Sequence, residues 1–478
     1  MSQTFSKIIP VTSPITTSCM EYVHPWTESC AQATCGLYLY CIYDSLRIYG
    51  TVYMLTLLMK GKIPSKEDLK KTLYGIIQST AFLSFTGFGY SLFLCLLRKT
   101  LGNFNILTVS AVPSFLSSVF SILIERPSRR ILLALYVSNI ATETLWNMAK
   151  SRNLVRSIKH GDVIIFSLSM AILSLFFKSG YHKKSDADNN HEDAMFRIMR
   201  FVVGPYEQEG YTSGEPNGFH RRVDKENGSS VSPSSSQVYK KKNTIFHVVT
   251  QMLKVYSNII NKIKSCDRSN TCPHPFSCLY YITEGTGRMF SLGLGLQVTL
   301  KLVLNLKRIF MSPTTIKSIL FKRETFNLPI FLGMYNCLFR ACLCILRRIR
   351  GKDSPVHALP AGILAGLAFS RYPDSTIALY VMWKVAQVTY NLGIDKGVVP
   401  KVSGFTELLY CFSTAVLFHA AILEPTNLRP SYWKFLHSIS GGRIACMARA
   451  PLDVWGLNST DSLNNVLMKT KTVPIVYF

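Results

Sequence analysis

The chain has 478 residues, of which 48% are hydrophobic and only 17% are charged, and its mean hydropathy is +0.19. A soluble domain usually carries about 25% charged residues. This composition therefore excludes an ordinary soluble enzyme, and the abundance of apolar residues excludes a broadly disordered chain. The 53 Lys and Arg exceed the 27 Asp and Glu by 26. Most of them stand in short groups between apolar segments, which favours anionic lipid headgroups and predicts no nucleic-acid partner.

The N-terminal residues 1–14 contain one lysine and no apolar run of signal-peptide length, so we do not expect a cleaved secretory signal. A membrane helix needs about 20 apolar residues, or fewer when flanking side chains can reach the interface. We predict five such helices before residue 178, namely Leu37–Met59, Leu73–Leu97, Phe104–Ile124, Ile131–Met148 and Val163–Phe177.

A polar region, residues 178–270, then interrupts the apolar segments. Its stretch Ser229–Ser236 reads SSVSPSSS, which is typical of a flexible linker. Apolar residues over Ile245–Ile263 recur at helical spacing with lysines between them, which predicts a basic amphipathic helix. Such a helix suits an anionic membrane surface, and the alternative is packing on another protein element. Ala194–Val203 is a weaker candidate of the same kind.

Five more apolar segments follow the linker, namely Leu279–Leu304, Phe326–Leu346, Pro355–Ser370, Thr376–Leu392 and Phe405–Leu423. The tail beyond them is polar. Within it, Arg429–Leu436 (RPSYWKFL) combines Tyr and Trp with basic residues, as segments at the headgroup level do. We therefore predict an all-α fold, a polytopic membrane helical bundle of about ten apolar helices with amphipathic surface helices.

The two sets of five segments resemble each other in sequence. ALYV occurs at Ala134–Val137 and again at Ala378–Val381, and CLLRK at Cys95–Lys99 matches CILRR at Cys344–Arg348. Because these and other matches keep their order, we predict two repeated halves. Five spans is an odd number, so the halves would be inverted relative to each other, a common plan in transporters.

The repeats set the expected domain boundaries. We predict a Cys-containing N-terminal segment (1–36), a first membrane repeat (37–177), a polar linker with the amphipathic helix (178–270), a second membrane repeat (271–425), and an interfacial segment with the C-terminal tail (426–478).

Polar side chains inside membrane segments are costly and usually face protein or water. Two sets stand at helical spacing, Asn139, Glu143 and Asn147 in the fourth segment, and Lys384, Gln387 and Asn391 in the ninth. If they face each other, they line a polar path for a substrate or an ion. The alternative is that they only hold helices together by hydrogen bonds.

Small residues give a separate signal for close helix packing. They recur after Pro113 in the third segment and after Pro360 in the eighth, and small residues at such spacing let helix backbones approach closely in lipid. The residues that we expect at these contacts are Ser114, Ser118, Ala361, Gly362, Ala365 and Gly366.

Thirteen cysteines are present, and several lie with a histidine just before the first or the sixth segment. HPW at His24–Trp26 matches HPF at His274–Phe276, and each is followed by a cysteine, Cys30 or Cys278. Thiolate and imidazole are good zinc ligands, but the paired C-x2-C spacing of structural zinc sites is absent. We therefore expect reduced thiols and no metal, with a disulfide or a metal site as alternatives. Enzyme motifs for hydrolysis, phosphate binding or acyl transfer are absent, so we predict neither an enzyme nor a cofactor.

Several long stretches resemble the transmembrane protein 135 family, also called peroxisomal membrane protein 52. They are ILIERPSRR at Ile122–Arg130, SNIATETLWNM at Ser138–Met148, LRPSYWKFL at Leu428–Leu436, Ala81–Gly102, and HPW with Cys30. Part of that family is weakly similar to the Tim17/Tim22/Tim23 translocase group, whose helices use faces of small residues. The resemblance carries over no catalytic residues, because the family has none agreed.

The resemblance implies an integral protein of mitochondrial or peroxisomal membranes that regulates the balance of mitochondrial fission and fusion and takes part in peroxisome and lipid metabolism. Its expected partners are membrane lipids and the fission machinery or other membrane proteins. The repeat and the polar residues favour an alternative, a transporter or translocase-like pore that moves a lipid, sterol, fatty acid or ion.

Overall fold

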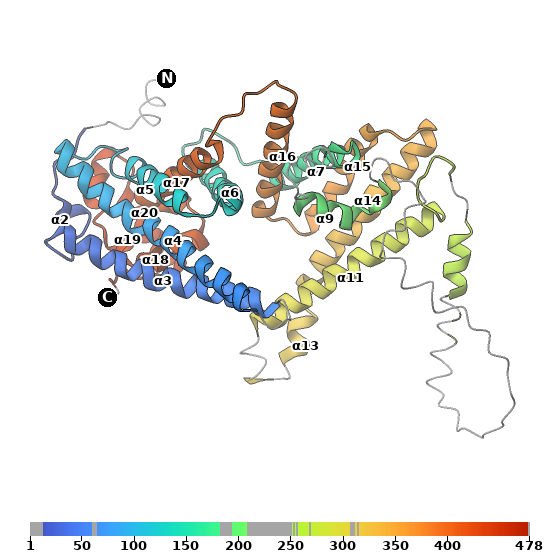
Figure 1. Cartoon of the computed structure of the whole chain (residues 1–478), viewed down its shortest axis with the longest axis horizontal. Coiled ribbons are helices and arrows are strands. Elements are labelled where there is room, and N and C mark those ends of the chain that lie inside the picture. The colour runs from blue at the N-terminus through green and yellow to red at the C-terminus, as the bar shows by residue number, and fades with distance from the viewer. Residues whose placement is uncertain are drawn as a thin grey trace. The chain divides into compact units, whose positions relative to one another are not determined.

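A computed structural model of the chain describes residues 13–59, 65–181, 194–207, 257–266, 269–305 and 315–476, together with 251, 254, 311 and 312. Throughout these ranges the fold consists of helices and their connections, and the only β-pairing is one isolated bridge between Ile15 and Phe104 (Figure 1). This confirms the predicted all-α fold. The Ser-rich linker and most of the expected helix over Ile245–Ile263 lie outside the described residues.

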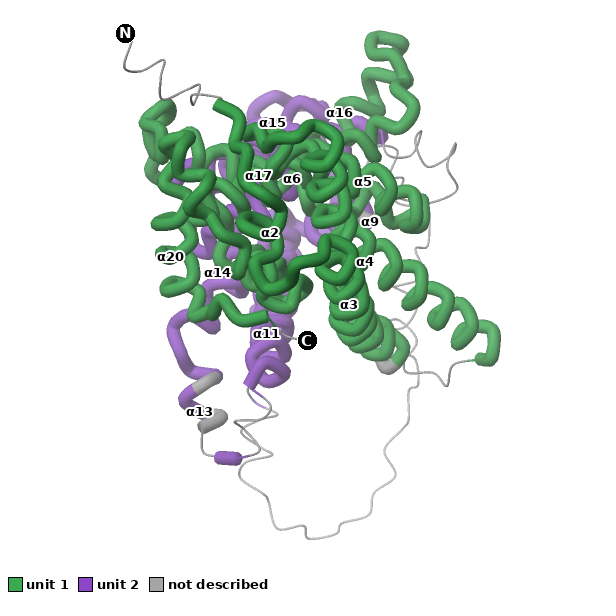
Figure 2. The backbone as a smooth tube through the Cα atoms, turned by 90° about the vertical axis from the view of Figure 1, so that its left-hand side faces the viewer, with its two compact units in different colours: residues 1–159, 386–478 green, residues 160–385 purple. Residues whose placement is uncertain are grey.

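The helices form two compact units (Figure 2), unit 1 with residues 1–159 and 386–478, and unit 2 with residues 160–385. Unit 1 contains α2 (Cys19–Tyr22), α3 (Cys30–Met59), α4 (Lys66–Leu101), α5 (Ala111–Ile124), α6 (Pro127–Ser151), α17 (Phe405–Leu423), η6 (Pro425–Asn427), α18 (Pro430–Ile439), α19 (Arg443–Cys446), η7 (Ala450–Trp455) and α20 (Ser459–Thr470). Unit 2 contains α7 (Gly161–Lys178), α9 (Ala194–Val203), η1 (Pro205–Glu207), α11 (Cys278–Leu304), α13 (Thr315–Leu320), η3 (Arg323–Phe326), α14 (Asn327–Arg350), η4 (Pro355–His357), α15 (Ala358–Gly366) and η5 (Leu367–Arg371). The remaining helix, α16 (Ser375–Asp395), runs across the boundary.

Each of the ten predicted apolar segments contains a helix, although residues 104–110 before α5 are not helical, and the helices differ in length and composition. Among the described helices, four are long and apolar enough to cross a bilayer: α4, α7, α17 and the stretch Arg323–Arg350, which ends in α14. By contrast, α5 has 14 residues and α15 has 9. Both are shorter than the roughly 20 residues that span a hydrocarbon core, so these two enter the fold as packed short helices.

The ends of α4 show why the chain forms a long helix there. Ser65 and Asp68 make a reciprocal capping box that satisfies the first backbone N–H groups. Arg98 and Lys99 lie in the last turn, where cations interact favourably with the helix dipole. Gly102, with φ of 71°, then ends the helix in the left-handed conformation that glycine adopts without strain. Between these signals the helix is apolar for the length of a membrane crossing.

The two units are built by the same order of helix contacts. In unit 1, α3 packs on α4, α4 on α5, and α5 on α17. In unit 2, α11 packs on α14, α14 on α15, and α15 on α7. The last helix of the first predicted repeat, α7, therefore lies in unit 2, and the last helix of the second predicted repeat, α17, lies in unit 1. The predicted boundaries follow the sequence repeats, whereas the compact units exchange α7 and α17.

One segment expected at the membrane surface packs inside unit 1 instead, and a second, α9, buries one face while Ile198 and Phe201 stay exposed. Tyr432 and Trp433 of α18 are buried, and the Trp433 indole donates to the Thr472 hydroxyl at 3.2 Å, so RPSYWKFL belongs to the core of unit 1. In α9, Phe196 and Met199 are buried within unit 2. An aromatic–basic sequence fits a headgroup region and a buried amphipathic helix equally well, which is why composition did not separate them.

Candidate functional site

A large open groove runs along α3 and α4, with a volume of about 1260 Å³. This exceeds the roughly 300–1,000 Å³ typical of small-molecule sites. On α4 its lining runs from Ile77 to Lys99, a distance of about 33 Å at the usual helical rise. Tyr38, Leu46 and Phe88 contribute to its mostly apolar wall.

One end of the groove is basic and lies beside a set of cysteines. Arg98 and Lys99 line this end, together with Cys19, Cys30 and Cys95. Arg98 donates from Nη2 to the carbonyl of Thr16 at 2.7 Å, which fastens the N-terminal segment to α4. Lys99 is exposed, so its ammonium is available to an anionic group at this end.

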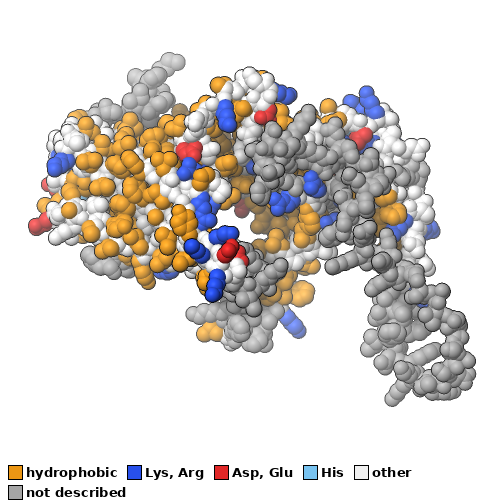
Figure 3. Space-filling view, viewed as in Figure 1, with side chains coloured by type: hydrophobic (Ala, Val, Ile, Leu, Met, Phe, Trp, Pro, Cys, Tyr) orange, Lys and Arg blue, Asp and Glu red, His pale blue; other side chains and the backbone are white. Residues whose placement is uncertain are grey.

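The outer faces of the same helices are apolar. In Figure 3, hydrophobic side chains form a broad surface over α3 and α4. Leu39 and Tyr43 are 62% and 65% exposed, and Leu73 is 57% exposed. A soluble monomer rarely exposes an apolar patch of more than a few hundred Å², so this face is suited to contact with lipid.

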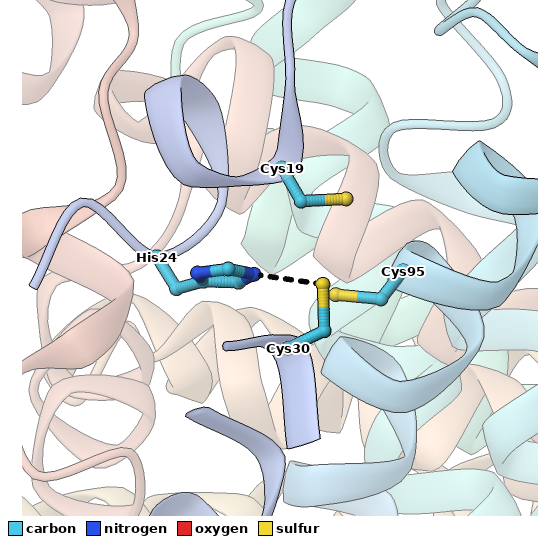
Figure 4. A group of neighbouring side chains, drawn as sticks. All are labelled: Cys19, His24, Cys30 and Cys95. Atoms are coloured by element: carbon cyan, nitrogen blue, oxygen red, sulfur yellow. Dashed lines mark hydrogen bonds between the residues drawn. The ribbon is translucent and has the colours of Figure 1, made fainter. Parts of the chain in front are cut away.

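In unit 1, three cysteines and one histidine converge at the basic end of the groove (Figure 4): Cys19 from α2, His24, Cys30 from the start of α3, and Cys95 from α4. Their ligand atoms all lie within 4.8 Å of one another. His24 Nε2 lies 3.2 Å from Cys30 Sγ, and its Nδ1 donates to the carbonyl of Thr27 at 2.9 Å.

Unit 2 holds a second group of the same composition. Its members are Cys272, His274, Cys278 at the start of α11, and Cys344 near the end of α14, again with all ligand atoms within 4.8 Å. His274 Nδ1 donates to the carbonyl of Phe276 at 2.7 Å, and Nε2 lies 3.6 Å from Cys344 Sγ.

Sequence reasoning grouped two of the four members of the first cluster and three of the four members of the second. His24 and Cys30 do come together, as do Cys272, His274 and Cys278, but Cys35 and Cys266 are exposed and lie outside the clusters. Cys95 and Cys344 complete them from distant positions, and none of the thirteen cysteines, all of which the structure describes, forms a disulfide. The neighbouring Cys95 thiol lowers the pKa of Cys19, and Cys344 lowers that of Cys272.

The predicted polar residues of α6 bind protein groups within unit 1. Glu143 forms an ion pair with Arg429, and the Asn147 amide donates to the carbonyl of Asn427 at 3.1 Å. Asn139 is buried on the same helix. These contacts join α6 to the connection between α17 and α18, the packing role that we weighed against a path.

The corresponding residues of α16 differ in exposure. Lys384 is buried, Gln387 is half-buried and Asn391 is exposed. Because α16 crosses the boundary of the two units, a polar path formed by both sets stays a prediction.

The small residues of α15 lie at a close helix contact. A Cβ on Gly362 would lie 2.5 Å from the Ala171 Cα atom, and one on Gly366 would lie 2.5 Å from the Ser167 Cα atom. Both neighbours are on α7. The other predicted packing residues, Ser114 and Ser118 of α5 and Ala361 and Ala365 of α15, are buried as well.

A buried charge network in unit 2 was not anticipated. Glu207 of η1 and Arg347 of α14 are both buried, with Arg347 Nη1 donating to Glu207 Oε1 at 3.0 Å. Tyr281 also donates to Glu207 at 3.0 Å, and Asp353 accepts from Arg347 at 3.1 Å. Although burial alone would raise the pKa of Glu207, the Arg347 guanidinium holds that pKa below its ordinary value.

Long apolar helices, a lipid-suited outer face and an apolar groove define the chain as an integral, multi-pass helical membrane protein. Residues 16–150 match the family model described as the N-terminal cysteine-rich region of Transmembrane protein 135. This region of the chain is therefore similar to the transmembrane protein 135 family. The matched stretch contains all of α2 to α5 and the whole first Cys–His cluster. No solved structure matches the chain. The expected similarity to the Tim17/Tim22/Tim23 group stays a prediction.

Proposed function

We propose that this protein binds an anionic membrane lipid in the groove of unit 1 and, by doing so in mitochondrial or peroxisomal membranes, regulates mitochondrial fission and fusion and peroxisome-linked lipid metabolism. In this proposal it acts by binding lipids and protein partners and not as an enzyme. The observation that carries the proposal is the groove itself, a long apolar channel open on one side with basic residues at one end.

The shape of the groove suits an acyl chain better than a compact metabolite. Its mostly apolar lining continues along α4 from Ile77 to Leu96, about five helical turns. Removing apolar surface from water stabilises it by roughly 25 cal/mol for each Å². An acyl chain in a bilayer is already out of water, so it gains nothing of this kind by entering the groove. Selectivity for a lipid therefore has to come from the shape and charge of the groove. Lys99 supplies the charge at the end where a headgroup would lie.

Photo-crosslinking in detergent or nanodiscs tests the site directly. A phospholipid with a photoreactive group on its acyl chain should label peptides of α3 and α4 in the groove. Ala81 lines the groove and is exposed, so Ala81→Trp should block labelling several-fold. Leu145→Trp is the matched control, because Leu145 is an exposed apolar residue of α6 outside the groove and its replacement should leave labelling unchanged.

The headgroup preference follows from Lys99. We expect phosphatidic acid or cardiolipin to compete with the probe better than phosphatidylcholine does, and Lys99→Glu to remove that preference. Lys150→Glu is the control, because it makes the same change of charge at an exposed position on α6. The Lys150→Glu protein should retain the preference for anionic lipids. Equal competition by anionic and zwitterionic lipids in the unmodified protein would argue against recognition of an anionic headgroup.

The cellular role needs a separate experiment. Cells lacking the protein should show altered mitochondrial length and altered peroxisomal lipid content. Re-expression of the Leu145→Trp protein should restore both, whereas the Ala81→Trp protein should restore neither. Normal organelles after deletion, or full rescue by Ala81→Trp, would contradict the proposed link between the groove and organelle shape.

A further inference from the structure

We infer that the two Cys–His clusters are a pair of zinc sites, one in each unit, in which three cysteines and one histidine bind a single Zn²⁺. The first site comprises Cys19, His24, Cys30 and Cys95, and the second comprises Cys272, His274, Cys278 and Cys344. This departs from our expectation from sequence, which favoured free thiols.

The spacing of the donor atoms fits one tetrahedral ion. Zinc binds sulfur at about 2.3 Å and imidazole nitrogen at about 2.0–2.1 Å, so neighbouring ligand atoms in a tetrahedron lie about 3.5–3.8 Å apart. In the second cluster, Cys272 and Cys278 sulfurs are 3.8 Å apart, and His274 Nε2 is 3.6 Å from Cys344 Sγ. In the first, His24 Nε2 is 3.2 Å from Cys30 Sγ. The sites therefore need only small movements to accept an ion.

The orientation of both histidines points to a metal. A metal-binding histidine usually donates its other ring N–H to a carbonyl or carboxylate, which fixes the ring and the tautomer. His24 donates from Nδ1 to the Thr27 carbonyl, and His274 donates from Nδ1 to the Phe276 carbonyl. Each ring consequently presents a lone pair on Nε2 to the three sulfurs. The His274 ring is also held by stacking on Tyr281, with centroids 4.6 Å apart.

The same donor set occurs twice at equivalent places in the sequence repeat. Cys95 lies 65 positions after Cys30, and Cys344 lies 66 positions after Cys278. In each unit, one cysteine begins the first long helix and another stands near the end of the helix packed against it, α3 with α4 and α11 with α14. Both copies of the repeat therefore keep three sulfurs and one nitrogen together, which a shared ligand explains better than packing alone.

The closed donor set indicates a structural role. Four protein ligands leave no open position for a reacting water, which is the arrangement of structural zinc sites. Three thiolates and Zn²⁺ carry a net charge of −1, and each site has an arginine three residues beyond its last cysteine, Arg98 or Arg347. The first ion would tie α2 and the segment before α3 to the end of α4, and the second would tie residues 272–278 to the end of α14.

The full-length protein purified in detergent tests the inference by elemental analysis. We expect two zinc ions per chain, one in Cys30→Ser and one in Cys278→Ser, and none in the double variant. Cys35→Ser and Cys266→Ser should retain two, because both cysteines lie outside the clusters. Two ions retained by the double variant would overturn the ligand assignment, and a preparation from zinc-replete cells with no stoichiometric zinc would overturn the sites. Visible absorption from an iron–sulfur cluster would also overturn the zinc assignment.

A second measurement uses the unaltered chain and so does not depend on the folding of variants. X-ray absorption at the zinc edge should show three sulfurs at about 2.3 Å and one nitrogen at about 2.0 Å. Maleimide should label Cys35 at once but Cys30 only after a strong zinc chelator is added. Equal labelling of both cysteines before chelation contradicts the first site.

Discussion

The two Cys–His clusters are alike, but their surroundings in unit 1 and unit 2 are not. In unit 1, Arg98 follows Cys95 by one turn and binds backbone carbonyls of the N-terminal segment. In unit 2, Arg347 stands at the equivalent place after Cys344 and binds two carboxylates, Glu207 and Asp353. The arginine thus has different partners in the two units, whereas both units have the same four donor atoms, three cysteine sulfurs and one histidine nitrogen. A feature that stays the same when its neighbours differ is better explained by a common ligand than by local packing.

The difference also predicts how each unit resists perturbation. Unit 2 is held near its cluster by charges that are buried from water, whereas the corresponding bonds of unit 1 are partly exposed. Breaking one partner of a buried ion pair leaves the other charge uncompensated, which costs more than losing a bond that water can replace. Equivalent substitutions in the two units should therefore have unequal effects.

The largest effect is expected for Glu207→Gln in unit 2. This change removes the carboxylate that accepts from Arg347 and Tyr281, and it should lower the free energy of unfolding by about 3–5 kcal/mol. Unfolding in mixed micelles with increasing SDS measures it. Glu284→Gln is the control in the same unit, since Glu284 is 45% exposed and its pairing with Arg340 spans 3.7 Å, so it should cost under about 1 kcal/mol. If both variants lowered the free energy of unfolding equally, the buried charge network would not be a major source of stability in unit 2.

A smaller effect is expected where α7 and α15 touch. The added methyl group of Gly362→Ala would meet the backbone of Ala171, which cannot move away as a side chain can, and the overpacking should cost about 1–3 kcal/mol. Gly89→Ala in unit 1 meets the Ser117 hydroxyl at 2.5 Å and should cost less, because that group can rotate. Gly295→Ala on α11 meets nothing within 4 Å and should be neutral or slightly stabilising. The same SDS titration ranks the three variants, and a Gly362→Ala protein as stable as Gly295→Ala would contradict the close contact.

Arg98→Gln should have a more local effect in unit 1. It removes charged hydrogen bonds to the carbonyls of Thr16 and Thr17, and bonds of this kind contribute about 1.5–3 kcal/mol, less where water can replace them. We expect faster backbone hydrogen exchange over residues 13–29 and little change in α14. Lys99→Gln, at the neighbouring exposed position, should leave exchange unchanged. Faster exchange throughout unit 1 would mean that Arg98 supports the whole unit.

The fold could be predicted from sequence further than the site could. Apolar runs predicted a helix in each of ten segments, because helix formation and hydropathy are local properties, but they placed the start of α5 seven residues too early. The matches CLLRK and CILRR already contained Cys95 and Cys344, yet nothing in their order shows that α4 and α14 return to the cysteines before α3 and α11. The clusters form only when two helices pack antiparallel, which short-range spacing does not encode.

Other features depended on still longer separations. Glu207 lies in the polar region after α9, where the local sequence predicts an ordinary solvent-exposed acid. Its partner Arg347 lies 140 residues away, so the local sequence does not indicate the ion pair. Trp433 was expected near headgroups because it stands among basic residues, and the packing of α18 on α20 buries it. In both instances the local sequence was compatible with two environments, and only contacts from distant helices selected one.

The smallest stability effect is expected for Glu143→Gln, and its value lies in separating packing from transport. Glu143 and Arg429 have side-chain exposures of 23% and 18%, so the pair should contribute about 0–1 kcal/mol, and Arg429→Gln should cost about the same. If the residue only joins α6 to the start of α18, the Glu143→Gln protein in liposomes should move fatty acid, sterol and ions at the same rate as the unmodified protein. A change in flux of tenfold or more without loss of stability would instead place Glu143 on a polar path, because a group that merely holds helices together cannot alter permeation while leaving the helices equally stable.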